Sequence, residues 1–389
     1  MSKFYIKYLC MFIGLGSFMT YLPVYLEKTL NFSPSQIGII VSIPSIIGIA
    51  LVPIWGIISD IIKKQKLILW INVLVAFLLG YLYSKTTSFI PIFIVAIFFE
   101  MFRNSLLPLA DTITTSYCKE QNKNYGKVRV LGSIGYALSA FICGHIMNLT
   151  GNDLAFFYMF MFSMLLCLFI TPYLNTPKEM ESKEKLNLKV DIKKLFTNKQ
   201  YVLILLASIS IVALSDGVSA YQGIHLLNLG AGKELVGMLT VFMVAPELYF
   251  MVKTKDLLKK YGNTKMITVS AIALFIRWII YTFTNNIALF ILASASHGVA
   301  IAIMTITVFD FIGNVVEKKL YTTAMTIYTF CIGIGSSVIK LIYGNIIDLY
   351  GMKAIFICSI IISIISFGII FAINKLEYKN INNTNIISE

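Results

Sequence analysis

The stretch PKEMESKEKLNLKVDIKKLFTNKQ, residues 177–200, is the one long hydrophilic segment in an otherwise apolar chain. It separates six apolar segments on its N-terminal side from six on its C-terminal side. Each segment meets the requirement of roughly 20 mostly apolar residues for a helix to cross the hydrocarbon core of a bilayer. The sequence therefore predicts an all-α membrane protein with twelve transmembrane helices in two six-helix bundles.

The composition excludes an ordinary soluble domain. Of the 389 residues, 58% are hydrophobic and 13% are charged, whereas about 25% of the residues of a soluble domain are charged. The net charge of +13 does not indicate a nucleic-acid partner, because the basic residues occupy short gaps between apolar segments. The six cysteines form no CxxC pair, so we expect neither a disulfide framework nor a metal site.

The expected spans fall into two sets of six. The first set covers residues 4–26, 37–59, 67–84, 89–117, 129–148 and 153–173. The second covers residues 201–227, 234–252, 266–284, 287–316, 320–344 and 354–374. The predicted domains are an N-terminal bundle (1–176), a cytoplasmic linker (177–200), a C-terminal bundle (201–378) and a cytoplasmic tail (379–389).

The lysines predict the orientation, because basic residues that flank membrane helices accumulate on the cytoplasmic side. A cytoplasmic N-terminus places 24 lysines, Lys7 among them, on the inner side and only four on the outer side. The outer four are Lys28, Lys85, Lys233 and Lys353. We therefore expect a plasma-membrane protein with both termini in the cytoplasm.

The two halves echo each other about 200 residues apart. GHIMNLTG (144–151) ends the fifth segment, and GNIIDLYG (344–351) ends the eleventh. DIIKK (60–64) follows the second segment, and DLLKK (256–260) follows the eighth. These echoes indicate a duplication, as in many transporter folds. We therefore expect the two bundles to be related by a pseudo-two-fold axis.

Two motifs carry a family resemblance. WGIISDIIKK (55–64) resembles the loop signature of the major facilitator superfamily, G-x-x-x-D followed by basic residues. YGKVRVLGSIGY (125–136) resembles the opening of helix five in the lactose permease and its relatives, the oligosaccharide, nucleoside and phenylpropionate-type proton symporters. The resemblance covers nearly the whole chain and implies the major facilitator fold. The residues that match the loop signature are Gly56, Asp60, Lys63 and Lys64.

The loop residues also have a purely structural interpretation. Gly56 would permit close helix packing, while Asp60 would cap a helix end or pair with a lysine. The position of the motif, between the second and third segments, favours the family interpretation.

Ionisable residues lie within the apolar segments, where each costs about 2.5–3.5 kcal/mol and usually has a partner and a function. Five acids face four permanent bases, which indicates pairing in or beside a polar cavity. Glu100 and Arg103, spaced i,i+3, can pair on one face of the fourth helix. The full set is Glu100, Arg103, Asp111, Arg129, Asp216, Glu247, Arg277, His297, Asp310 and Lys340.

Asp111 and Arg129 are the strongest candidates for substrate binding. Arg129 offers a planar fork of donors, and Asp111 can orient it or accept from a ligand. Tyr136 lies two turns after Arg129 on the same helix face, where it could stack against a sugar or base ring. The resemblance implies substrate contact for all three residues. The alternative is a structural ion pair near the inner mouth.

The resemblance also implies proton coupling. Glu247 matches a glutamate that links substrate binding to proton binding, and Arg277 and His297 match an arginine on helix nine and a histidine on helix ten. A carboxylate that exchanges a proton while alternately meeting an arginine or a substrate gives a physical basis for coupling. For His297, a satisfied interior histidine is the alternative.

One departure from the lactose permease affects the proton route. Ala300 stands where that permease keeps its proton-releasing glutamate. Asp310 or Asp216 could replace it, as their place in apolar segments suggests.

These features predict a monomeric, proton-coupled symporter for a small polar ring compound, a sugar or oligosaccharide first. A nucleoside or aromatic acid is the alternative, and a multidrug exporter is a third possibility. Helix five (LGSIGYALSAFICGHI, 131–146) lacks the proline of the exporter motif. The chain contains no HExxH or P-loop motif, so we expect neither an enzyme nor an ATP-driven carrier. The expected partners are the substrate, protons and the bilayer, with the proton gradient as energy source and no cofactor.

Overall fold

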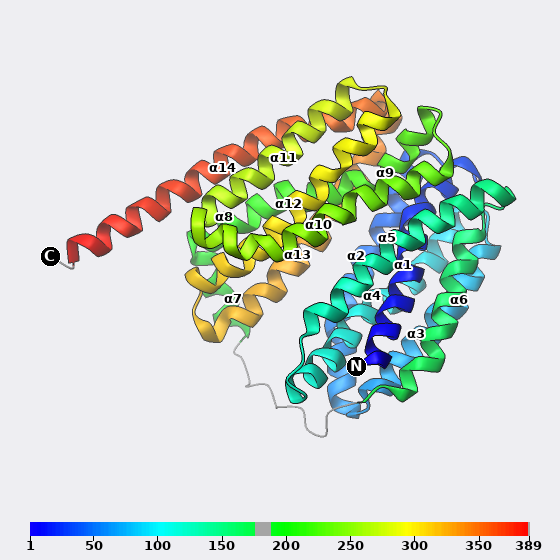
Figure 1. Ribbon diagram of the computed structural model, residues 1–389, viewed down its shortest axis with the longest axis horizontal. Helices are drawn as coiled ribbons and strands as arrows, with labels where there is room; N and C mark the ends of the chain where they lie inside the picture. Colours follow the sequence, from blue (N-terminus) through cyan, green and yellow to red (C-terminus); the bar gives the residue numbers. More distant parts are fainter. Residues whose placement is uncertain (176–187, 388–389) are drawn as a thin grey trace. The chain divides into compact units, whose positions relative to one another are not determined.

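A computed structural model describes residues 1–175 and 188–387 of the chain. Within these residues the regular structure is entirely helical, and no strand occurs (Figure 1). Among the described residues, twelve helical spans are long and apolar enough to cross a membrane. The predicted all-α, twelve-span membrane fold is thus confirmed.

The first six spans are formed by six long helices. In chain order the elements are α1 (Ser2–Lys28), α2 (Pro34–Ile62), α3 (Gln65–Lys85), α4 (Phe89–Glu120), α5 (Tyr125–Thr150), α6 (Ala155–Ile170) and the 3-10 turn η1 (Thr171–Tyr173). Most of these helices extend a few residues beyond the predicted spans, because polar residues outside the apolar stretch continue the helix. Ser33 and Gln36 form a capping box that starts α2.

The remaining elements follow residue 187. They are α7 (Leu188–Thr197), α8 (Lys199–Ser208), the π turn η2 (Ile209–Ala213), α9 (Leu214–Asn228), α10 (Lys233–Tyr261), α11 (Asn263–Phe283), α12 (Ile287–Val315), the 3-10 turn η3 (Lys318–Leu320), α13 (Tyr321–Tyr350) and α14 (Met352–Ile387). The seventh span combines α8, η2 and α9. The short helix α7 lies within the predicted linker and was not expected.

The echoing sequences end in the same backbone conformation. Gly151 follows α5 with φ 65°, and Gly351 follows α13 with φ 80°. Glycine adopts this left-handed conformation without the steric cost that a Cβ imposes, and it therefore ends helices. The echo thus marks equivalent helix ends in the two halves.

Contacts divide the chain into two compact units. The first contains Met1–Ser182, Ser219–Val244 and Lys340–Tyr350, and the second contains Lys183–Val218, Ala245–Ile339 and Gly351–Glu389. The boundaries therefore fall inside α9, α10 and α13. The predicted domain limits stay a prediction, and part of the predicted linker (177–187) and the last two residues of the predicted tail lie outside the described residues. The described part of that tail continues α14 (Figure 1).

The first unit is built around α1, which packs against α5 and α6, while α4 packs against α2 and α3 (Figure 1). Phe18 of α1 lies at the centre of an aromatic cluster. Its ring centroid is 4.8 Å from that of Phe99 on α4 and 5.2 Å from that of Phe160 on α6. Tilted and edge-to-face contacts of this kind are favourable ring geometries.

Lys7 differs from a solvated inner-side lysine, because its side chain is completely buried. Its ammonium donates to the hydroxyl of Thr171 in η1 at 2.6 Å. The second turn of α1 faces α6, so Lys7 lies inside the first unit and adds nothing to the basic inner surface.

The second unit is built around α11, which packs against α12 and α14, while α14 also packs against α8. Tyr281 of α11 stacks on Phe290 of α12, with ring centroids 3.7 Å apart and planes 13° from parallel. Phe356 of α14 meets Tyr281 edge-on at 5.3 Å. Aromatic side chains thus join three helices of this unit.

A charged contact joins three helix ends in the first unit. Lys233, at the start of α10, forms an ion pair with Asp153 in the turn before α6. Thr29, after α1, donates its hydroxyl to the other oxygen of that carboxylate at 2.6 Å. Partial burial acts to raise the pKa of Asp153, but the hydrogen bonds from Lys233 and Thr29 and the Lys233 charge outweigh it and hold this pKa below its usual range.

The lowered pKa predicts an acid-sensitive contribution to stability. A carboxyl whose pKa is depressed by folding stabilises the protein above its unfolded pKa of about 3.9, and this stabilisation is lost as the pH falls through the lowered folded value. We expect Asp153→Asn to lower the melting temperature at pH 7 by about 1–3 °C. The difference should shrink when melting is measured in detergent at successively lower pH, down to about pH 3.

Lys233→Gln provides the control for this prediction. The double variant should melt close to the less stable single variant, because either substitution alone removes the ion pair. A difference between wild type and Asp153→Asn that stays constant down to pH 3 would contradict the assignment.

Candidate substrate and coupling sites

Two tyrosines hold the carboxylate of Asp111 in the first unit. Tyr8 of α1 donates its hydroxyl to Oδ1 of Asp111 at 2.5 Å, and Tyr125, the first residue of α5, donates to the same oxygen at 2.7 Å. Within the described part of the chain, no side chain donates to the other oxygen, Oδ2. The tyrosines therefore orient Asp111 and leave one oxygen available to accept from a ligand.

Arg129 lies on α5 and stacks on an aromatic ring. Its guanidinium carbon is 4.5 Å from the centroid of Phe12 on α1, a cation–π distance. Its Nη1 is buried and has no hydrogen-bond partner among the residues that the structure describes. The ion pairs of the described residues include none between Arg129 and Asp111, so the two groups do not form the direct pair that the sequence suggested.

This arrangement is complementary to a hydroxyl group. A hydroxyl can accept from a guanidinium and donate to a carboxylate at the same time. Asp111 has an oxygen without a donor, and Arg129 has a buried donor without an acceptor. A buried donor without a partner costs about 1–3 kcal/mol, so a ligand that satisfies it gains affinity.

Two further features of α5 support this site. Tyr136, two turns after Arg129 on α5, is half-buried. A Cβ at Gly132, between them, would come within 2.8 Å of the Phe12 ring. Gly132 therefore allows α1 to approach α5 closely enough for Phe12 to reach Arg129.

Glu100 and Arg103 form the predicted pair on α4. The Arg103 Nε donates to Oε1 of Glu100 at 2.8 Å, and Nη2 pairs with Oε2. Asn104 also donates to Oε2, at 3.0 Å. Both carboxylate oxygens are thus occupied inside the cluster, which favours a structural role.

In the second unit, a serine joins Arg277 to His297. Ser215 of α9 lies between α11 and α12, and its Oγ is 2.7 Å from Nδ1 of His297. Arg277 donates from Nη1 to the same Oγ at 3.1 Å. All three side chains are buried. The two residues that the resemblance singled out therefore share one partner, which sequence reasoning did not identify.

A π turn places Ser215. The turn Ile209–Ala213 interrupts the seventh span immediately before Leu214–Asn228. A π turn adds one residue to a helical turn, which rotates the residues after it by about 100° relative to a continuous α-helix. Such turns often occur at functional sites. The periodicity of the sequence alone contains no sign of it.

The other predicted coupling residues differ in burial. Glu247 lies in α10 directly after Pro246, and its side chain is half-buried. Asp216, next to Ser215, is also half-buried and lies within electrostatic reach of Tyr328 on α13. Asp310 is exposed near the end of α12 and accepts from Asn314 at 3.1 Å, and its part in proton coupling stays a prediction.

Comparison with known proteins agrees with this architecture. The MFS_1 like family matches residues 1–358. The chain belongs to this family. The transporter YwbF of Bacillus subtilis (strain 168), itself uncharacterized, is 28% identical to this chain over 95% of its length and 92% of the relative. A maltose permease of Geobacillus stearothermophilus is 22% identical, over 97% of this chain and 95% of the permease.

The crystal structure of the nucleoside transporter NupG has the same fold. It superposes with a TM-score of 0.82 at 17% identity, over 96% of this chain and 98% of NupG. The family match, the transporter relatives and the twelve apolar spans of the described residues together show that the protein is a multi-pass membrane transporter of the major facilitator superfamily.

The superfamily loop motif ends α2. Lys63 follows the helix in a left-handed conformation, φ 55°, and both Lys63 and Lys64 are exposed. A Cβ at Gly56 would meet no atom of the described residues within 4 Å, so these residues do not show the close packing expected there. The side chain of Asp60 lies outside the described residues.

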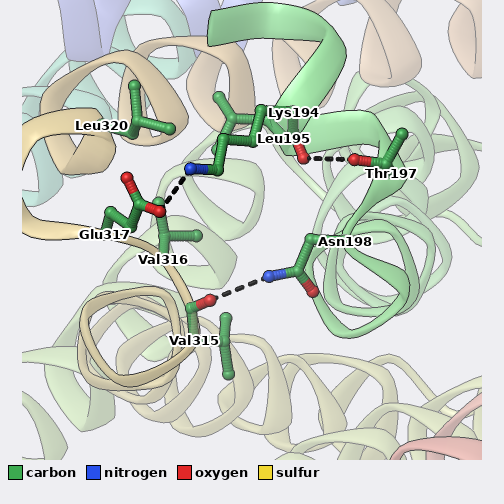
Figure 2. Close-up of a pocket in the computed structure, with 8 residues that line it drawn as sticks. All are labelled: Lys194, Leu195, Thr197, Asn198, Val315, Val316, Glu317 and Leu320. Atoms are coloured by element: carbon green, nitrogen blue, oxygen red, sulfur yellow. Dashed lines mark hydrogen bonds and ion pairs between the residues drawn. The ribbon is translucent and has the colours of Figure 1, made fainter.

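Figure 2 shows a hollow of about 300 Å³ in the second unit of this transporter, between α7 and the turn after α12. Lys194 pairs with Glu317 across it, and Asn198 donates to the carbonyl of Val315 at 2.8 Å. The hydrogen bond from Lys194 holds the pKa of Glu317 below its usual range. These polar groups bind one another and so attach α7 to the end of α12. The hollow is therefore not a candidate substrate site.

The shared serine leads to a prediction for this transporter. Ser215→Ala should lower the melting temperature in detergent by several degrees, because it removes a partner shared by buried Arg277 and His297. Ser270→Ala is the matched control, since within the described residues that buried hydroxyl bonds to the carbonyl of Met266 in its own helix, at 3.2 Å, and to no other helix. Equal shifts in the two variants would show that Ser215 does not join the two residues.

Proposed function

We propose that this transporter is a proton-coupled symporter that imports a small polar ring compound, a sugar or oligosaccharide first, by alternating access. The plasma membrane would hold it with both termini in the cytoplasm, as the lysine distribution suggests. The observation that carries the substrate assignment is that Asp111 and Arg129 together offer an acceptor and a donor for hydrogen bonds to a ligand. One offers a carboxylate oxygen without a donor, and the other offers a buried donor without an acceptor.

A saccharide fits this arrangement for two reasons. Its adjacent hydroxyls can accept from Arg129 and donate to Asp111 together, which a lipophilic drug cannot do. Aromatic rings commonly pack on the apolar faces of sugars, and Phe12 and Tyr136 supply rings from α1 and α5. Two relatives are named for sugars, the maltose permease of Geobacillus stearothermophilus and a sucrose permease of Escherichia coli.

Nucleosides are the second candidate. A ribose supplies the same pair of hydroxyls, and its base could stack on Tyr136. The nucleoside permease NupG of Escherichia coli is 20% identical to this chain over 87% of its length and 86% of the permease.

Proton coupling is proposed for the second unit. Arg277, Ser215 and His297 form a buried hydrogen-bonded chain, and Glu247 and Asp216 supply half-buried carboxylates on α10 and α9. A carboxylate that is protonated in one conformation and meets a cation in the other would link proton binding to the conformational change. Exposed Asp310 is the weaker carboxylate for this role.

The test is uptake into proteoliposomes with an inward proton gradient. We expect one of radiolabelled maltose, sucrose or uridine to accumulate, and its transport to acidify the lumen. Arg129→Lys and Asp111→Asn should each lower uptake at least tenfold, because each removes a charge-assisted hydrogen bond to the substrate. Arg103→Lys is the matched control, since a lysine there can still pair with Glu100.

The outcomes separate the parts of the proposal. Uptake unchanged by Arg129→Lys and Asp111→Asn would overturn the binding site. Accumulation that persists after a protonophore collapses the gradient would overturn symport. Resistance to lipophilic cations on overexpression, without uptake of any polar compound, would instead indicate an exporter.

A further inference from the structure

Two buried tyrosines make the same set of contacts in the first unit. The hydroxyl of Tyr21 on α1 lies 2.8 Å from the carbonyl oxygen of Ala140 on α5 and 3.1 Å from that of Lys233, the first residue of α10. The tyrosine ring is completely buried. Its single proton is therefore shared between a carbonyl of its own half and a carbonyl of the other half.

Tyr221 repeats this arrangement from the second half. Its hydroxyl on α9 lies 2.6 Å from the carbonyl oxygen of Lys340 on α13 and 3.4 Å from that of Pro34, the first residue of α2. Its ring is also completely buried. Here too one acceptor belongs to the tyrosine's own half, and the other is the carbonyl of the first residue of a helix in the opposite half.

The two contacts are related by the internal duplication. Tyr21 and Tyr221 are 200 positions apart, as are Ala140 and Lys340. The second acceptors, Pro34 and Lys233, are 199 positions apart. A donor and both of its acceptors thus recur at nearly the same offset. This match is more specific evidence for an internal duplication than the sequence echoes alone.

Glycines make room for both contacts. A Cβ at Gly144 would come within 3.0 Å of the Tyr21 hydroxyl and the Lys233 carbonyl. At Gly344 it would come within 3.0 Å of the Tyr221 hydroxyl and the Pro34 carbonyl. These two glycines open the echo sequences of residues 144–151 and 344–351. The echo thus preserves the space that each tyrosine needs.

We propose that Tyr21 and Tyr221 are paired latches that hold one end of the transporter closed in this conformation. The proposal rests on alternating access, because the two halves must separate at this end in the opposite conformation. It places the latches at the end that the lysine distribution assigns to the outside. Polar contacts lie beside them at the helix ends, including the bond from the Ser35 amide to Asp348 at 3.0 Å.

The geometry makes such latches reversible. When the halves separate, Tyr21 loses the carbonyl of Lys233 and keeps that of Ala140, and Tyr221 loses Pro34 and keeps Lys340. No buried hydroxyl is left without an acceptor in either conformation, so opening avoids the cost of an unsatisfied group. The closed conformation gains only the additional acceptor.

The test measures the exposure of Cys143, which is completely buried on α5 next to Gly144. It uses the full-length chain in membrane vesicles, with the other cysteines replaced by serine and Cys143 kept. The measured quantity is the rate of alkylation by N-ethylmaleimide. This readout requires neither a substrate nor a proton gradient, so its failure is distinct from a failure of the proposed transport function.

We expect Tyr21→Phe and Tyr221→Phe each to increase the alkylation rate about twofold to threefold, because the closed conformation gains only the second, longer acceptor of a shared proton, which contributes less than a full hydrogen bond. The result for Tyr221→Phe is decisive, because Tyr221 bonds to α13 and α2 and not to α5. It can uncover Cys143 only by shifting the equilibrium of the whole molecule. If Tyr21→Phe fails to fold, the alkylation rate of Tyr221→Phe alone tests the proposal.

Two buried tyrosines supply matched controls. The Tyr83 hydroxyl has no hydrogen-bond partner in the described part of the chain, and the Tyr201 hydroxyl donates to the carbonyl of Ala324, in its own half, at 2.8 Å. Tyr83→Phe and Tyr201→Phe should leave the alkylation rate unchanged. An increase with Tyr21→Phe but not with Tyr221→Phe would show local loosening and overturn the proposal, as would no increase with either.

Discussion

The hydrocarbon core of the bilayer provides no hydrogen-bond partners, and the rest of this structure depends on that constraint. Every backbone N–H and C=O within the core must be satisfied by the chain itself, which leaves helices as the spanning elements of an open chain. Twelve such helices account for nearly all of the described residues. The same constraint acts on side chains, so each polar group inside the spans needs a partner from another helix or from a ligand.

The partners found in the structure divide the intramembrane charges into two kinds. Glu100 and Arg103 satisfy each other within one helix turn and with Asn104, and this cluster has little left to offer a ligand. Asp111 and Arg129 are each held by aromatic residues and retain hydrogen-bonding capacity. A group that remains incompletely satisfied in a dry environment is the group whose interaction with a substrate yields the largest gain.

Duplication connects this chemistry to the conformational change. Each half carries a tyrosine whose hydroxyl reaches the first carbonyl of a helix in the other half, with a glycine beside it. Such a contact is weak enough to break during a transport cycle, because a neutral hydrogen bond contributes only about 0.5–1.5 kcal/mol. Two equivalent contacts add their effects while each remains easy to break.

The sequence by itself determined the fold class, the approximate limits of the spans and the duplication. These properties depend on hydropathy over about 20 residues and on local repeats, which are one-dimensional signals. It also identified the i,i+3 pair of Glu100 and Arg103, because a helix places such residues on one face. The motif around Arg129 contained Tyr125, although nothing in the sequence showed that its hydroxyl binds Asp111.

Only the tertiary structure decided which polar groups meet. Tyr8 and Asp111 are 103 positions apart, and Ser215 and His297 are 82 apart, so no periodicity relates them. The π turn before Ser215 rotates the side chains of α9 about the helix axis, which the periodicity of an ideal α-helix does not predict. Lys7 appeared in the sequence as one more lysine of the basic inner side, yet packing of α1 on α6 buried it against Thr171. Hydropathy determines which segments enter the membrane, but the rotation and packing of each helix determine the partners of its side chains.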